Sequence, residues 1–298
     1  MSQRLDMFAK SGHILALVRE FVKDLRLEGR GVLGVCEEVE GKIRALGANP
    51  AFPCNIGINE IAAHYTSPWN DTSSIPEGSI VKVDFGVEID GFVTDTAITV
   101  SLNPAYDSMV VAAETALQEA LAAVAPGRKL SEIGSVIERC IDRYGFKPIR
   151  NLTGHKIDRY TIHAGKSVPN VSSVESGRFE VGEVYAVEPF VTLRNAEGAV
   201  REGGNMQIYR FVKVKGAKST EAIRLAEFVQ NTYKTLPFAQ RWLHKSRSES
   251  TFNRAFEELI VRRCIVGYPV LVEASGQVVS QAEHTMVVTE NGCRVLTA

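Results

Sequence analysis

Apolar residues recur along this chain with two different periods. A spacing of three and four residues, which predicts amphipathic helices, occurs in six segments. The helical segments are residues 4–26, 32–47, 106–125, 131–145, 218–234 and 251–263. Strand-like segments, β-branched or alternating with period two, lie between and after them. They are residues 51–58, 80–100, 149–164, 184–193 and 270–296. The pattern therefore predicts a mixed α+β protein.

The order helix, helix, strands occurs twice in the first two-thirds of the chain. This order predicts two similar halves, whose junction would bring side chains from each half together. Residues 196–265 then interrupt the strand-rich part, and we expect them to form a small inserted helical subdomain. The whole chain, residues 1–298, is expected to be a single domain that contains this insert.

The stretch VKVDFGVEIDGFVTDTAITV contains two carboxylates where apolar core residues are expected. Asp90-Gly91 is a strong signal for a two-residue hairpin turn, so Asp84 should face Ala97. Asp95 lies two residues before Ala97, and therefore on the same face of the hairpin as Asp84. Such diagonal neighbours have Cβ atoms roughly 7–8 Å apart, a gap suited to bridging by metal ions. Alternatively, both aspartates flank the turn or an edge in solvent.

Three further polar residues lie in strand-like surroundings, namely His155, Glu188 and Glu283. Alone, such a histidine is most often a hydrogen-bonded core residue, and a glutamate before proline often ends a strand. Together with Asp84 and Asp95, however, they supply four carboxylates and one imidazole, which would offset two divalent cations. Oxygen-rich ligation with one nitrogen and no thiolate suits Mn, Fe(II) or Co better than a structural zinc site. Two such ions predict metal-assisted hydrolysis of an amide.

Composition narrows the classes of partner. The formal net charge is −1 over 298 residues, without a long run of like charges, so neither nucleic acid nor an anionic membrane is favoured. The five cysteines form no CxxC pair, which indicates reduced thiols in a cytosolic setting. No signal peptide opens the chain, and no apolar run reaches the roughly 18 residues of a membrane span. A basic group is expected to be a solvated helix end: Arg241, His244, Lys245 and Arg247.

Five stretches of the sequence resemble type II methionine aminopeptidases, which are metallopeptidases of the pita-bread fold. The similarity is greatest to the short archaeal form and covers nearly the whole chain. The stretches are FPCNIGINEIAAHYTSP (52–68), VDFGVEIDGFVTDTA (83–97), GHKIDRYTIHAGKSVPNV (154–171), GEVYAVEPF (182–190) and QAEHT (281–285). The resemblance implies two pseudo-symmetric αβ halves around a curved antiparallel sheet, with the helical insert that separates type II from type I at 196–265.

The resemblance also implies which residues bind metal. Asp84 would chelate one ion, while Asp95 and Glu283 would bridge both ions. His155 and Glu188 would complete the second ion. The resemblance implies two divalent ions, drawn from Co, Mn, Fe(II) and Zn.

Catalytic and substrate-binding roles follow from the same resemblance. His64 would contact the scissile amide or the departing amine, His163 would hydrogen-bond the substrate carbonyl, and Glu188 would carry a proton to the leaving amine. A small apolar pocket would select the unbranched thioether of methionine. The family lining of this pocket corresponds to Phe52, Pro53, Ile162, His163 and Tyr268, and His64 is counted with them as a substrate-binding residue.

The implied activity is removal of the N-terminal methionine from peptides and nascent chains with a small second residue, in the cytoplasm. Ribosome association and oligomeric state stay open, with a monomer as the default. One alternative is an X-Pro aminopeptidase or prolidase on the same fold, but such proteins usually carry an additional N-terminal domain and lack AAHYT. Another alternative is a non-catalytic pita-bread binding protein, which would have lost metal ligands. Every ligand position is filled here.

Overall fold

The centre of the largest sheet is the hairpin that the alternating pattern predicts. The computed structural model describes residues 3–174, 177–244 and 249–298. Strands β4 (Ile80–Ile89) and β5 (Phe92–Ser101) are joined by Asp90 and Gly91, whose φ angles are 51° and 83°. Positive φ at both positions is the geometry of a type I′ turn. Asp84 pairs with Ala97, so the predicted turn and register are confirmed.

Antiparallel neighbours extend this hairpin into a nine-stranded sheet. The order along the sheet is β1-β4-β5-β15-β9-β7-β8, with β2 added to β4 and β16 added to β15. The added strands are β1 (Asn49–Pro50), β2 (Asn55–Ile58), β7 (Thr153–Ile157), β8 (Ser167–Pro169), β9 (Val184–Val187), β15 (Glu283–Thr289) and β16 (Gly292–Val295). The sheet therefore joins strands from the first half, the second half and the end of the chain.

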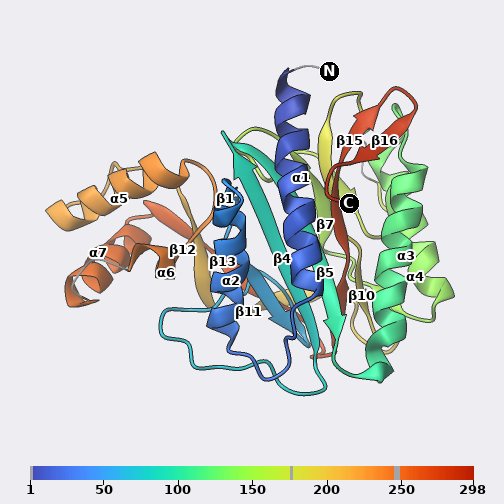
Figure 1. Cartoon of the computed structure of the whole chain (residues 1–298), viewed down its shortest axis with the longest axis horizontal. Coiled ribbons are helices and arrows are strands. Elements are labelled where there is room, and N and C mark those ends of the chain that lie inside the picture. Colours follow the sequence, from blue (N-terminus) through green and yellow to red (C-terminus); the bar gives the residue numbers. More distant parts are fainter. Residues whose placement is uncertain (1–2, 175–176, 245–248) are drawn as a thin grey trace.

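Two pairs of helices bury apolar faces against this sheet (Figure 1). The helices are α1 (Gln3–Lys23), α2 (Val32–Ala45), α3 (Asp107–Ala123) and α4 (Leu130–Arg143), with a 3₁₀ turn η1 (Pro104–Tyr106) before α3. Buried side chains of α1 and α2 form one apolar core with β4, and those of α3 and α4 form another with β9 and β15. The predicted repeat of helix, helix, strands thus corresponds to two helix pairs on one sheet.

Two predicted strand segments are interrupted, and both interruptions carry polar site residues. The segment 184–193 divides at Glu188-Pro189 into β9 and β10 (Phe190–Thr192), because proline has no N–H for the sheet ladder. β10 lies between β6 (Lys147–Pro148) and β14 (Val279–Gln281) in a separate three-stranded sheet. The segment 149–164 is a strand only at 153–157, and the chain then turns back so that the Lys156 N–H donates to the Lys166 carbonyl.

The region 196–265 contains strands as well as helices. β11 (Val200–Phe211) pairs with β12 (Phe238–Ala239) and β13 (Ile265–Glu273), and β13 pairs with β3 (Ile61–Ala63). Helices α5 (Thr220–Tyr233), α6 (Gln240–Leu243) and α7 (Glu249–Val261) lie beyond this sheet, away from α3 and α4 (Figure 1). They share an apolar core with β11 and β13. The division of the chain into a domain and an inserted subdomain stays a prediction.

Candidate metal centre and its pocket

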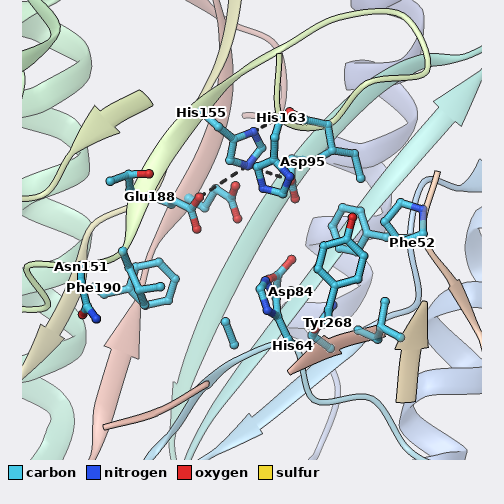
Figure 2. A pocket seen from close by; sticks show the side chains of 18 residues that line it. Phe52, His64, Asp84, Asp95, Asn151, His155, His163, Glu188, Phe190 and Tyr268 are labelled. Carbon is cyan, nitrogen blue, oxygen red and sulfur yellow. Dashed lines mark hydrogen bonds and ion pairs between the residues drawn. The ribbon is translucent and has the colours of Figure 1, made fainter. Parts of the chain in front are cut away.

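A cavity of about 220 Å³ opens where the nine-stranded sheet meets the β11–β13 sheet. Figure 2 shows that acidic and imidazole side chains converge on one part of it. All five predicted metal ligands line the cavity, and they come from five different strands or strand ends: Asp84, Asp95, His155, Glu188 and Glu283. The predicted contacts Phe52, His64, Ile162, His163 and Tyr268 line it as well.

Backbone contacts fix the orientation of His155. Its Nδ1 lies 2.7 Å from the Ile162 carbonyl, which can only accept, so Nδ1 carries the proton. The unprotonated Nε2 therefore faces Asp95 Oδ2 at 3.7 Å and Glu188 Oε1 at 3.5 Å. A carbonyl that holds the second ring nitrogen is the usual support of a metal-ligating histidine. His155 is thus prepared to offer a lone pair to a cation.

Asp95 and Glu283 are buried, Asp84 and Glu188 are half-buried, and all four carboxylates have few partners. Asp84 Oδ1, Asp95 Oδ1 and Glu283 Oε1 are buried oxygens without a hydrogen bond. The Gln281 side-chain amide donates to Glu188 Oε2 at 3.3 Å and to Glu283 Oε2 at 3.5 Å. No lysine or arginine of the described chain forms an ion pair with any of the four. Buried carboxylates without a counter-charge are costly, so a further cationic group is required.

Burial and the lack of a counter-charge also shift the pKa values of the acids and of His155. Burial raises the pKa of Asp84 to about 7. Burial and the neighbouring carboxylates raise the pKa of Asp95, Glu188 and Glu283 well above the ordinary range. Burial also lowers the pKa of His155 to about 3, which keeps its imidazole neutral. Acids that repel one another around a neutral imidazole are the electrostatic pattern that a divalent cation reverses.

The donor set fits divalent metal. Ligand atoms of Asp95, His155 and Glu283 all lie within 4.8 Å of one another. Glu188 is within reach of the same imidazole, and Asp84 lines the same cavity. Oxygen ligands with one imidazole nitrogen suit a first-row divalent ion, and the unpartnered oxygens are the positions that such an ion would satisfy.

Two further histidines lie beside this centre. His64 Nδ1 is 3.2 Å from the Pro269 carbonyl, so its Nε2 is the unprotonated nitrogen. Burial lowers the pKa of His64 to about 4, and burial also lowers the pKa of His163. The His163 ring is 4.4 Å from the ring of His155, and the His64 ring is 5.5 Å from that of Tyr268. Both imidazoles are therefore neutral near pH 7 and close to the acids.

An apolar compartment adjoins the acidic one. Its walls are formed by Phe52, Ile162, Ile208, Pro237 and Tyr268, whereas Phe190 lies apart from Phe52 and Tyr268, beside Asn151 (Figure 2). Pro53, the remaining predicted contact, is buried behind this lining, and its carbonyl accepts a hydrogen bond from the Asn55 side chain at 2.8 Å. The cavity thus combines an apolar slot with a charged floor.

Some site residues were not singled out by the sequence analysis. Gln281 lies two residues before Glu283, and this spacing on a strand would have placed both on one face. Asn55 lines the cavity and is the register partner of Asp84. The expectation that Arg241 belongs to a solvated helix end is wrong, because its side chain is 3% exposed and pairs with Glu40. Lys245 and Arg247 lie outside the described residues.

All five cysteines are free thiols, as the sequence pattern predicts. Within the described ranges, no helix has the length and apolar character to cross a membrane.

Comparison with known proteins identifies the family. A model of metallopeptidase family M24 matches residues 7–290. The methionine aminopeptidase of Methanocaldococcus jannaschii is 42% identical over 97% of this chain and 96% of its own length. That of Saccharolobus solfataricus is also 42% identical, over 95% of this chain and 94% of its own. These matches confirm the resemblance to archaeal methionine aminopeptidases.

Solved structures show the fold. A thermophilic Arx1 has a TM-score of 0.84 at 20% identity, over 99% of this chain and 91% of its own. A methionine aminopeptidase from Thermotoga maritima has a TM-score of 0.70 at 20% identity, over 100% and 97% of the two chains. A prolidase from Pyrococcus furiosus reaches 0.65 at 16% identity, but only 64% of its chain is covered. The predicted pita-bread fold is confirmed, and the chain belongs to metallopeptidase family M24.

Proposed function

We propose that this enzyme removes the N-terminal methionine from peptides and nascent chains, and that it does so with two divalent ions. Asp84, Asp95, His155, Glu188 and Glu283 would hold the ions, which are drawn from Co, Mn, Fe(II) and Zn. One observation carries the proposal: four buried or half-buried acids and a neutral imidazole line one cavity beside an apolar slot. The full-length similarity to methionine aminopeptidases supports the same activity.

The chain's own groups divide the work of amide hydrolysis. Bound divalent ions supply charge that polarises the scissile carbonyl and acidifies a water molecule. The Glu188 carboxylate, 13% exposed at the cavity wall, accepts a proton from the attacking water and passes it to the departing amine.

His64 and His163, which are not among the proposed metal ligands, bind the substrate amide. His64 presents an unprotonated Nε2, which can accept the N–H of the scissile amide. His163 is neutral, so it can donate one ring N–H to the substrate carbonyl as negative charge develops on that oxygen. Placing an acceptor and a donor on opposite sides of one amide orients it for attack.

The apolar compartment selects the first residue. Phe52, Ile162 and Tyr268 leave a slot with no charged wall, and an unbranched thioether fills such a slot well. The free α-amine of the substrate would lie against the acids, which restricts cleavage to the first residue. A pocket bounded by these walls also favours substrates with a small second residue.

The remaining parts of the proposal concern setting and partners. One chain supplies all five proposed ligands, and a monomer is the proposed state. Nascent chains in the cytoplasm are the expected substrates, and association with the ribosome would bring the enzyme to them. The relatives favour methionine release over the X-Pro alternative, and retention of all five ligands argues against a non-catalytic role.

A peptide panel tests the function. Purified protein is titrated anaerobically with Mn, Fe(II) or Co and given Met-Ala-Ser, Leu-Ala-Ser and Ala-Pro-Ser peptides. We expect release of methionine from the first peptide and little from the others. A folded, metal-loaded protein that cleaves none of them contradicts the proposed activity, and preference for the X-Pro peptide supports the prolidase alternative.

A further inference from the structure

A buried ion pair lies outside the metal centre and connects two helices, α2 and α6. Glu40 of α2 and Arg241 of α6 are 2% and 3% exposed, and Arg241 Nη2 donates to Glu40 Oε1 at 2.5 Å. The Trp242 indole N–H donates to Glu40 Oε2 at 2.7 Å. The partners are separated by about two-thirds of the chain, so this contact ties α6 to the first half of the molecule.

The same pair reaches the backbone beside the cavity. The Cys54 N–H donates to Glu40 Oε1 at 3.1 Å. The Thr66 hydroxyl donates to the Cys54 carbonyl at 2.7 Å and accepts from Arg241 Nη2 at 3.0 Å. Both polar groups of the Cys54 backbone are therefore held by one network, which we name the Glu40–Arg241 clamp and define as Glu40, Thr66, Arg241 and Trp242.

The position of Cys54 and Thr66 relates this clamp to the substrate slot. Cys54 is two residues after Phe52 and next to Asn55, both of which line the cavity. Thr66 is two residues after His64, which also lines it. His64 has a φ of 63°, a strained conformation for a residue other than glycine, so its backbone needs support from its surroundings.

The α6 end of the clamp is also close to the slot. Pro237 lines the cavity, and the strand β12 that follows it leads directly into α6. Displacing α6 would therefore move a wall of the slot as well as release the segments that carry Phe52 and His64. Both Nη atoms of Arg241 donate to Glu40, and Nη2 also donates to Thr66, and a buried charge pair bonded in this way holds a more fixed geometry than a solvated pair.

We propose that Arg241 and Glu40 are positioning residues, which act through Thr66 to set the distance between the methionine side-chain slot and the His64 imidazole. The pair itself does not touch substrate. The pair affects how the enzyme discriminates between first residues of the substrate. The reason is that the segment with the slot residue Phe52 and the segment with His64, which contacts the substrate amide, are held by the same hydrogen bonds. The expected change in substrate preference rests on the proposed function, whereas the hydrogen-bonded link between α6 and the segments at Cys54 and Thr66 does not.

The mildest test removes only the hydroxyl in the middle of the clamp. Thr66→Val keeps the volume of the side chain and the ion pair but removes the hydrogen bonds to Cys54 and from Arg241. Thr66→Ser restores the hydroxyl. Thr192→Val is the matched control, because Thr192 is also fully buried and donates to a backbone carbonyl, that of Val278 at 2.9 Å, without lining the cavity.

Three readouts are measured at a temperature well below unfolding, after metal content is shown to be unchanged. For Thr66→Val we expect kcat/KM for Met-Ala-Ser to fall about 3- to 10-fold, because the two lost hydrogen bonds support the site without touching substrate. The preference for Met-Ala-Ser over Leu-Ala-Ser should fall about 3-fold or more. Hydrogen exchange of the segment 52–58 should become about 10-fold faster.

Thr66→Ser should restore all three values, and Thr192→Val should change none of them. Unchanged preference and exchange in Thr66→Val overturn the proposal, and so does an equal change in Thr192→Val. If Thr66→Val does not fold, Trp242→Phe, which removes one donor to Glu40, is measured in the same way. A wild-type protein that releases no methionine contradicts the proposed function alone, and the exchange rates then decide whether the clamp holds this segment.

Discussion

At the scale of single residues, backbone carbonyls determine what each histidine can do. The carbonyls of Ile162 and Pro269 hold Nδ1 of His155 and His64, so both rings present an unprotonated Nε2 to the cavity. His155 faces carboxylates at 3.5 and 3.7 Å and is placed as a ligand. His64 faces the slot and Tyr268, and is placed to meet the substrate amide. The same tautomer thus makes His155 a metal ligand beside the carboxylates and His64 a hydrogen-bond acceptor beside the slot.

This difference leads to a prediction for two alanine variants. His64→Ala and His163→Ala should lower kcat about 100- to 10,000-fold, because each removes a positioned hydrogen bond to the reacting amide. Metal content, measured by elemental analysis, should equal that of the wild type. His13→Ala, which changes an exposed histidine of α1, is the control and should retain full activity. Loss of metal from either variant would mean that the residue is a ligand.

At the scale of elements, local patterns predict pairs that are close in the sequence. The alternation around Asp90-Gly91 gives the β4–β5 register, and with it the shared face of Asp84 and Asp95. The interruption at Glu188-Pro189 is less visible, because periodicity shows an extended segment but not a change of sheet. The Glu40–Arg241 pair has no local signal at all, since its partners are 201 positions apart.

The hairpin turn allows a prediction about its neighbour, the loop that carries Ile162. Gly91 has a φ of 83°, and an added Cβ would lie 2.3 Å from the ring of Tyr160. Gly127 has a φ of 80° but nothing within 4 Å of an added Cβ. Gly91→Ala should therefore lower the free energy of unfolding by more than the about 1 kcal/mol expected for Gly127→Ala. Equal losses in urea titrations would show that Tyr160 moves aside freely.

At the scale of the whole molecule, metal binding should hold separate parts of the sheet together. Asp84 and Asp95 belong to the first hairpin, His155 and Glu188 to the second half, and Glu283 to the last third of the chain. Without a cation, these strands carry buried acids toward one another, and burial and repulsion raise their pKa values. The apolar cores under each helix pair must therefore outweigh this repulsion in the metal-free fold.

The gain in stability from metal should consequently depend on pH. Acids with raised pKa values retain protons in the metal-free fold at pH 6, and Asp84, at about 7, is still largely protonated there. Metal must displace these protons, so its apparent affinity is weaker at pH 6 than at pH 8. At pH 8, manganese at 100 times its Kd should add about 2.7 kcal/mol, or about 5 °C in Tm. The increase in Tm should be smaller at pH 6.

The increase in Tm on adding metal, rather than Tm itself, is the informative quantity. Protonation of the acids favours the metal-free fold as pH falls, whereas buried histidines disfavour it. Burial lowers the pKa of His64 to about 4, so the fold loses stability as pH falls below about 6.5, where the unfolded histidine takes up a proton. This loss affects the metal-free and metal-loaded protein alike if His64 is not a ligand, and it cancels in the difference. Asp95→Asn should abolish the increase at both pH values. An increase that is equal at pH 6 and pH 8, or that persists in Asp95→Asn, would mean that the stabilising metal binds elsewhere than among these acids.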